Sequence, residues 1–213
     1  MPPNRLTPFQ REVLREFFRR EDRFFLTGGG ALAGFHLGHR ETLDLDLFTT
    51  SGPMDEGSRA LAEVARHLGA SFEQLRSAPD FRRALLKRGQ DSVIVDLVFE
   101  RVPQIVGEKP TVDSIRLDPP EEILANKLCT LLSRAELRDL VDVWALERAG
   151  YRIEDALPAA SRKDGGLTPA QLAWVLSEVQ IGEDARPPGN VDVATLRAYL
   201  SSLVTRLAAL ARP

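Results

Sequence analysis

Apolar and polar positions alternate in short runs through the first half of the chain. Such runs at residues 23–27, 42–48, 81–87 and 92–99 are rich in β-branched and aromatic residues and predict β-strands. Residues 7–20 instead repeat apolar positions every three to four residues, which predicts an amphipathic helix. Thr7 followed by Gln10 is typical of the reciprocal cap that begins such a helix. Strands and helices therefore alternate up to about residue 112.

From residue 118 onward the pattern is almost purely helical. Helices are predicted near residues 119–132, 134–149, 168–179 and 191–211. Ser133 and Thr168 are each followed three residues later by Glu or Gln, which predicts helix starts there. We therefore predict two domains, an α/β (α+β) domain over residues 1–112 and an α-helical domain over residues 113–213.

A glycine turn follows the strand at 23–27 and precedes a short predicted helix. Gly28, Gly29 and Gly30 allow the backbone to turn sharply and leave bare amides at the start of that helix. The helix dipole favours an anion at this position. The turn is therefore a candidate phosphate-binding site, although three glycines are also common in ordinary turns.

Two aspartates interrupt the apolar strand that follows. Because side chains alternate along a strand, Asp44 and Asp46 should share one face, while Leu43, Leu45 and Leu47 should point into the core. The two α-carbons would be roughly 6 to 7 Å apart. Like charges on one face of a strand repel, so the pair indicates a compensating cation rather than a merely solvated face.

Asp96 interrupts another apolar strand, at residues 93–99. An unpaired buried carboxylate is costly, so this residue should meet a metal ion or a cationic side chain, unless it faces water at a sheet edge. Cys129 is the only cysteine, and there are three histidines, so a thiolate or imidazole site is excluded. We therefore predict a magnesium site held by Asp44, Asp46 and Asp96, in which manganese can substitute.

Lys127 lies within the apolar stripe of the helix predicted at 119–132. A lysine on an inward face is costly unless it extends to the solvent or meets anions. A triphosphate would supply such anions, so Lys127 is a candidate nucleotide-binding residue.

Composition and charge narrow the classes of function. Of the 213 residues, 43% are hydrophobic, which is ample for a core. The formal net charge of −3 excludes a protein that binds nucleic acid through an overall positive charge. Arg82, Arg83 and Arg88 could still contact an RNA backbone, or form a solvated face. There is no apolar run of about 20 residues and no signal-peptide pattern, so we expect a soluble cytoplasmic protein without a membrane partner.

Several of these segments together resemble the motifs of the AbiEii/AbiGii abortive-infection nucleotidyltransferase toxins. The resemblance covers about residues 24–148. It is carried by Gly28-Gly29-Gly30, Arg40-Glu41-Thr42-Leu43-Asp44-Leu45-Asp46-Leu47-Phe48, Asp96, Lys127 and Arg138-Asp139-Leu140-Val141-Asp142. It implies a polymerase-β-like fold, with a mixed sheet flanked by helices and a C-terminal helical domain that contributes Lys127 and Asp139 to the active-site cleft. The third glycine stands where the family usually has Ser, Thr or Ala.

The resemblance also implies a reaction and its residues. The expected activity is magnesium-dependent transfer of a nucleoside monophosphate from a nucleoside triphosphate to an acceptor hydroxyl, with RNA, tRNA included, as acceptor and a paired antitoxin as partner. Asp44, Asp46, Asp96, Lys127 and Asp139 are the implied catalytic residues, and the first three hold the metal. The implied phosphate-binding residues are Gly28, Gly29, Gly30, Arg40, Thr42 and Lys127.

Two rival interpretations remain open on the sequence alone. Gly28, Gly30 and Ala33 match a dinucleotide-binding fingerprint, which would indicate a Rossmann-like oxidoreductase. That fold needs a parallel crossover, for which the segment before Asp44 is short. The chain could also be a non-catalytic relative that binds RNA or protein, although three aspartates and Lys127 would then have no use.

Overall fold

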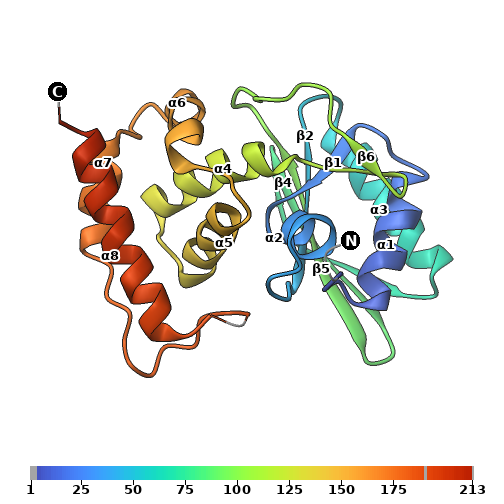
Figure 1. The fold of residues 1–213 in the computed structure, drawn as a ribbon. Helices are drawn as coiled ribbons and strands as arrows, with labels where there is room; N and C mark the ends of the chain where they lie inside the picture. Colours follow the sequence, from blue (N-terminus) through green and yellow to red (C-terminus); the bar gives the residue numbers. More distant parts are fainter. Residues whose placement is uncertain (1–3, 190, 213) are drawn as a thin grey trace. The chain divides into compact units, whose positions relative to one another are not determined.

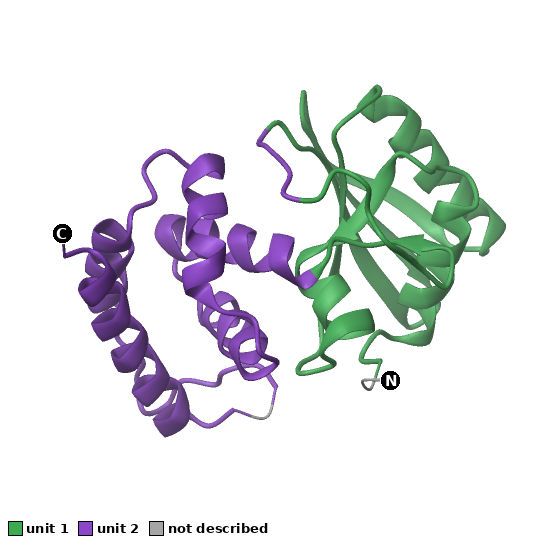
Figure 2. Ribbon diagram, turned by 45° about the horizontal axis from the view of Figure 1, so that its top comes forward, with its two compact units in different colours: residues 1–101, 106–119 green, residues 102–105, 120–213 purple. Residues whose placement is uncertain are grey.

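A computed structural model describes residues 4–189 and 191–212 and divides the chain into two compact units (Figures 1 and 2). Unit 1, green in Figure 2, extends to Arg101 and also contains Val106–Pro119. Unit 2, purple, contains Val102–Ile105 and the chain from Pro120 onward. The boundary predicted between residues 112 and 113 lies inside unit 1.

Unit 1 is built on a five-stranded mixed sheet in the order β1-β2-β5-β4-β3. The strands are β1 (Phe24–Thr27), β2 (Asp44–Thr49), β3 (Ser71–Ala78), β4 (Phe81–Arg88) and β5 (Asp91–Phe99). Only β2 and β5 run parallel, and the other neighbours are antiparallel. Two short strands, β6 (Thr111–Val112) and β7 (Ile115–Arg116), form a separate hairpin.

Two helices, α1 (Pro8–Phe18) and α3 (Met54–His67), pack on one face of this sheet (Figure 1). Thr7 and Gln10 form the predicted reciprocal cap at the start of α1. Phe9 and Leu14 of α1 are buried with Leu61 of α3 and with Leu45 and Leu97 of the sheet. The opposite sheet face has more exposed positions and carries the acidic residues, because the side chains alternate.

The connection from β1 to β2 begins with α2 (Gly28–Ala31) and the π-helix η1 (Leu32–His36). β1 and β2 then pair antiparallel. A dinucleotide-binding fingerprint requires a parallel strand-helix-strand unit, so the Rossmann interpretation of the glycines is wrong.

Unit 2 is helical. Its helices are α4 (Pro120–Ser133), α5 (Leu137–Arg148), α6 (Ile153–Lys163), α7 (Pro169–Ser177) and α8 (Val193–Leu210). The helix start predicted at Ser133 is wrong, because Ser133 ends α4 and α5 begins after Glu136. Ala135 has φ +47°, a left-handed conformation that separates the two helices.

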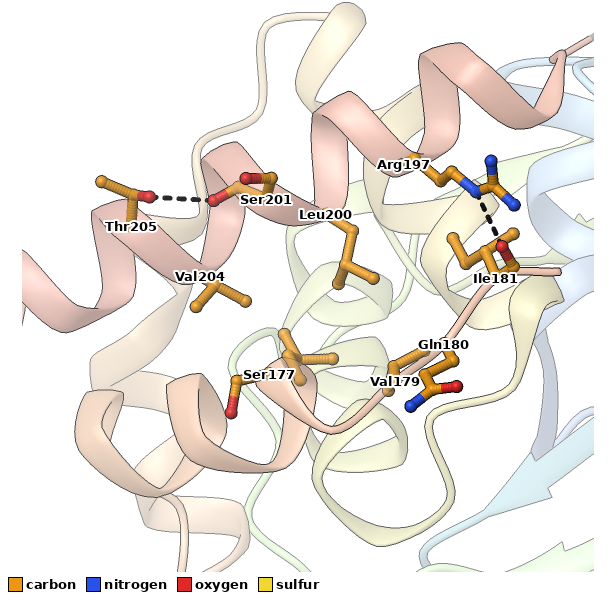
Figure 3. Close-up of a pocket in the computed structure, with 10 residues that line it drawn as sticks. Ser177, Val179, Gln180, Ile181, Arg197, Leu200, Ser201, Val204 and Thr205 are labelled. Atoms are coloured by element: carbon orange, nitrogen blue, oxygen red, sulfur yellow. Dashed lines mark hydrogen bonds between the residues drawn. The ribbon is translucent and has the colours of Figure 1, made fainter. Parts of the chain in front are cut away.

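Surface hollows among the described residues of unit 2 include two of similar size. One of about 530 Å³ opens between α7 and α8, beside Leu200, Val204 and the hydrogen bond from Arg197 Nε to the Ile181 carbonyl (Figure 3). The other, also about 530 Å³, lies beside Tyr151 and Arg162. Neither is lined by Asp44, Asp46 or Asp96. Within residues 4–189 and 191–212, no helix has the length and apolarity needed to span a bilayer.

Candidate active site

The acidic strand β2 places two carboxylates on one face of the sheet. Asp44 and Asp46 are half-buried, whereas Leu45 and Leu47 between and beyond them are fully buried in the core. The prediction that Leu43 points into the core is wrong, because Leu43 is 85% exposed. β2 begins at Asp44, so the alternation of faces does not extend back to Leu43.

The parallel pairing of β2 with β5 aligns the third carboxylate with the first two. Asp46 and Asp96 are register partners on these neighbouring strands. Side chains of register partners lie on the same face of a sheet. The three predicted aspartates therefore share one face, on the side opposite the α1 and α3 layer.

Asp96 is also bound by an arginine. Arg83 of β4, its register partner on the other side, donates from Nε and Nη2 to both carboxylate oxygens, at 2.7 and 2.6 Å. Asp96 is only 5% exposed, and this bidentate pair compensates its burial. Donation of these hydrogen bonds to Asp96 raises the pKa of Arg83, and the charges of Asp96, Asp44 and Asp46 add to the effect.

The acidic side chains do not converge on one point in this arrangement. Among the described residues, no group of three or more His, Cys, Asp or Glu side chains is placed to hold a metal ion. The sequence analysis expected either a metal ion or a cationic side chain beside Asp96, and the structure shows the cationic side chain, Arg83. The donor set still suits a hard cation, because all three groups are carboxylates on adjacent strands.

Contrary to the prediction, the three glycines do not precede a helix but form the first turn of α2, and this glycine turn packs directly against the acidic strand. Gly28 has φ +58°, and a Cβ atom there would lie 2.7 Å from Asp46 Oδ2. A Cβ on Gly29 would lie 2.7 Å from Arg40 Nη2. A Cβ on Gly30 would instead meet Leu26 at 3.1 Å, so the third glycine faces the core. Glycine is thus required at Gly28 by both conformation and space.

Thr42 and Arg40 lie behind this turn, and both are buried. Thr42 Oγ1 donates to Asp44 Oδ1 at 3.0 Å, and Gln10 Nε2 of α1 donates to the Thr42 carbonyl at 2.9 Å. Arg40 donates from Nη1 to the Glu41 carbonyl at 2.9 Å. Of the residues predicted to bind phosphate, Thr42 thus orients an aspartate, and Arg40 supports the turn from beneath Gly29.

Lys127 and Asp139 form a buried ion cluster inside unit 2. Lys127 Nζ lies 2.8 Å from Asp139 Oδ1 and 2.7 Å from Asp142 Oδ2. Arg134 adds a second cation, donating from Nε to Asp139 Oδ2 at 2.9 Å. Two aspartates of α5 therefore supply the anions that the sequence argument expected from a triphosphate.

The protonation states of this cluster follow from its charges. Burial alone would lower the pKa of Lys127, but Asp142 and Asp139 outweigh it and raise that pKa. Burial alone would raise the pKa of Asp139, but Arg134 and Lys127 outweigh it and lower that pKa. Lys127 and Asp139 are therefore both held charged near neutral pH.

The arginines considered for RNA contact are paired with carboxylates. Arg82 binds Asp55 at 3.0 Å, and Arg88 binds Glu12 at 2.6 Å. Together with the Arg83–Asp96 pair, these contacts neutralise much of the positive charge on β4. An RNA backbone would have to compete with them.

Sequence reasoning missed Arg83 as the partner of Asp96, although a signal was present. Arg88 and Asp91 are register partners that flank a two-residue turn, and Gly89 in this turn has φ +60°. Counting back equally along both strands from such a turn aligns Arg83 with Asp96. Gln10 was recognised only as a capping residue, so its contact with Thr42 was also missed.

The chain was compared with known proteins. Residues 12–190 match the family described as "Nucleotidyl transferase AbiEii toxin, Type IV TA system". The crystal structure of JHP933 from Helicobacter pylori is similar with a TM-score of 0.57 at 16% identity, over 93% of this chain and 88% of that one. A candidate nucleotidyltransferase from H. pylori is similar with a TM-score of 0.56 at 17% identity, over 96% and 95%. No curated protein matches. These likenesses confirm the predicted polymerase-β-like mixed sheet with flanking helices.

Proposed function

The chain belongs to the AbiEii nucleotidyltransferase toxin family, and from this premise we propose that it transfers a nucleoside monophosphate to RNA in a magnesium-dependent reaction. An acceptor hydroxyl oxygen attacks the α-phosphorus of a nucleoside triphosphate. The new oxygen–phosphorus bond forms as the bond to the β-phosphate breaks, pyrophosphate leaves, and the hydroxyl proton passes to solvent. The family is described as part of type IV toxin–antitoxin systems, so a cognate antitoxin belongs to the proposal.

The observation that carries the proposal is the row formed by Asp46 and Asp96 beside Asp44, next to the Gly28 turn. Like charges on one sheet face are unfavourable unless cations join them. A nucleotidyltransferase has a use for this arrangement, because phosphoryl chemistry depends mainly on positioning and charge neutralisation. A binding module has none.

Asp44, Asp46 and Asp96 would hold the magnesium ion. Bound there, the metal would neutralise donor phosphates and lower the pKa of the acceptor hydroxyl. The fit rests on the hard carboxylate donors and on the close approach of the Gly28 backbone to Asp46, which a Cβ atom would obstruct.

The protein's own groups prepare this site. Thr42 fixes one oxygen of Asp44 through its hydroxyl, and Gln10 fixes Thr42 in turn. Gly28 leaves Asp46 its position. Arg40 adds positive potential beneath Gly29, so that the amides of the turn favour a donor phosphate. For Lys127 and Asp139 we propose that the main role of their buried ion cluster is to stabilise unit 2.

Incubation with magnesium, each of four labelled nucleoside triphosphates and total RNA tests the proposal. We expect label transfer by the wild type and a loss of at least about 100-fold in Asp46→Asn, in the range seen when one electrostatic group of an active site is removed. Asp91→Asn is the matched control, because Asp91 is an exposed carboxylate at the start of β5.

Two results would contradict the proposal. One is near-normal transfer by Asp46→Asn when its circular dichroism and melting temperature match those of the wild type. The other is no transfer from any of the four nucleotides by the wild type, which would favour a non-catalytic relative.

A further inference from the structure

Asp96 already has a cationic partner, which engages one side of its carboxylate group. Both carboxylate oxygens accept hydrogen bonds from one guanidinium, that of Arg83. Such bidentate, charge-assisted pairs are among the strong hydrogen bonds of proteins. Among the described residues the three carboxylates do not converge in this geometry, and a cation drawn to Asp96 would meet the positive charge of Arg83. The metal ion and the guanidinium therefore compete for Asp96.

The position of Arg83 explains why it takes that place. Register pairing produces one row across the sheet, in which Asp46 of β2 is followed by Asp96 of β5, Arg83 of β4 and Arg76 of β3. Arg83 thus lies where its charge offsets two neighbouring carboxylates. It does the electrostatic work of a bound cation while remaining part of the chain.

The surroundings of Arg83 could also accommodate its guanidinium away from Asp96. Its side chain is 42% exposed, and its guanidinium carbon lies 5.8 Å from the centre of the Phe81 ring. Arg76 lies 5.7 Å from the same ring. A guanidinium that leaves Asp96 keeps both its hydration and an aromatic surface.

We propose that Arg83 is a resident cation, which a divalent metal must displace from Asp96, so that this residue sets the metal affinity of the site. The inference rests on the proposed function in one respect, the use of Asp96 as a metal ligand. It assigns to Arg83 an effect on metal affinity, and Arg83 lies outside the motifs that carry the family resemblance.

The test is a titration of Mn²⁺ binding without nucleotide. The electron paramagnetic resonance signal of the free ion measures how much Mn²⁺ remains unbound. Arg83→Gln should bind Mn²⁺ roughly tenfold or more tightly than the wild type, because the ion no longer competes with two charge-assisted hydrogen bonds. Arg76→Gln is the matched control, since it removes one positive charge from the same row and the same ring. It should change the affinity by no more than about twofold to threefold, the size of a screened surface charge.

Two further variants complete the experiment. Arg83→Lys keeps the charge without the bidentate geometry and should give an intermediate affinity, which serves if Arg83→Gln does not fold. In the double variant with Asp96→Asn, the gain in affinity should disappear. In EDTA, Arg83→Gln should melt at a lower temperature than the wild type. Added Mn²⁺ should raise the melting temperature of Arg83→Gln by more than it raises that of the wild type.

Three outcomes would overturn the inference. If Arg83→Gln binds Mn²⁺ no more tightly than Arg76→Gln, Arg83 does not compete with the metal. If it binds more weakly, Arg83 holds Asp96 in place as a ligand instead. In both cases the wild type still binds metal and the proposed function stands. If neither protein binds Mn²⁺, the metal site itself fails, and the proposed function fails with it.

Discussion

Asp46 of β2 and Asp96 of β5 are register partners on adjacent parallel strands, and both lie on the sheet face opposite the helical layer. Two carboxylates in this relationship repel one another. The protein tolerates the arrangement because Arg83 neutralises one of them from the next strand. The same row of the sheet therefore contains the proposed metal ligands and the arginine that compensates their charge.

The Gly28 position should accept no side chain. In Gly28→Ala, we expect a loss of stability of about 1–2 kcal/mol from the left-handed backbone alone, and a further loss as the new methyl group pushes Asp46 aside. Gly89→Ala has nearly the same φ, +60° against +58°, but open space within 4 Å, so it isolates the backbone cost. Urea unfolding and transfer assays on both variants would reveal equal losses if contact with Asp46 were unimportant.

Thr42 should matter for activity as well as for folding. Thr42→Val preserves shape but removes the hydroxyl that donates to Asp44, and the stability cost should be about 0.5–1.5 kcal/mol, as for one hydrogen bond. We expect the transfer rate to fall by roughly tenfold, the equivalent of about 1.4 kcal/mol in the barrier. Thr42→Ser should recover most of that rate, and failure to recover it would argue against the role of the hydroxyl.

Lys127 should be required for the stability of unit 2. Lys127→Met leaves the buried carboxylates of Asp139 and Asp142 without this partner, and removing one member of a buried ion cluster typically costs about 3–5 kcal/mol. Lys87→Met, at an exposed position of β4, should change little. Denaturant unfolding measures both. A wild-type stability for Lys127→Met, combined with a raised KM for the nucleoside triphosphate, would support direct phosphate binding instead.

The same cluster predicts a dependence of stability on pH at both ends of the scale. The pKa of Asp139 is lowered from 3.8, so its contribution is present above pH 3.8 and is lost as the pH falls through the folded value below it. The pKa of Lys127 is raised from 10.5, so its contribution is present below pH 10.5 and is lost as the pH rises through the folded value above it. Thermal melts should show both losses in the wild type. Asp139→Asn should flatten the acid limb, and an unchanged limb would contradict this assignment.

The motif-bearing elements were predictable from the sequence because their patterns are local. Glycines at residues 28–30, two aspartates in an apolar run, and Asp96 in another run lie within strands that periodicity identifies. β3 was not predicted, since most of its residues are exposed and its apolar positions do not alternate regularly. α3 and α6 were also not predicted individually. In the structure, Gly57 of α3 packs against Phe24.

The contacts between segments were harder to predict than the segments themselves. Arg83 was predicted as a possible RNA contact and Lys127 as a nucleotide-binding residue, but their partners come from other elements of the chain. Asp142, for example, contacts Lys127 only because α4 and α5 pack together. Leu43 shows a different error, in which a correct strand was predicted to begin two residues too early, at residue 42 instead of Asp44.

The two-residue turn at Gly89 constrains the length of the chain around it. Arg83 and Asp96 lie 13 residues apart and meet because the two arms of the hairpin are equally long. A single residue inserted in one arm would turn the guanidinium to the helix-covered side and leave Asp96 buried without it. Natural relatives that keep this ion pair should therefore vary freely in the identity of most residues here, yet keep the two arms equal in length, with any insertion confined to the turn.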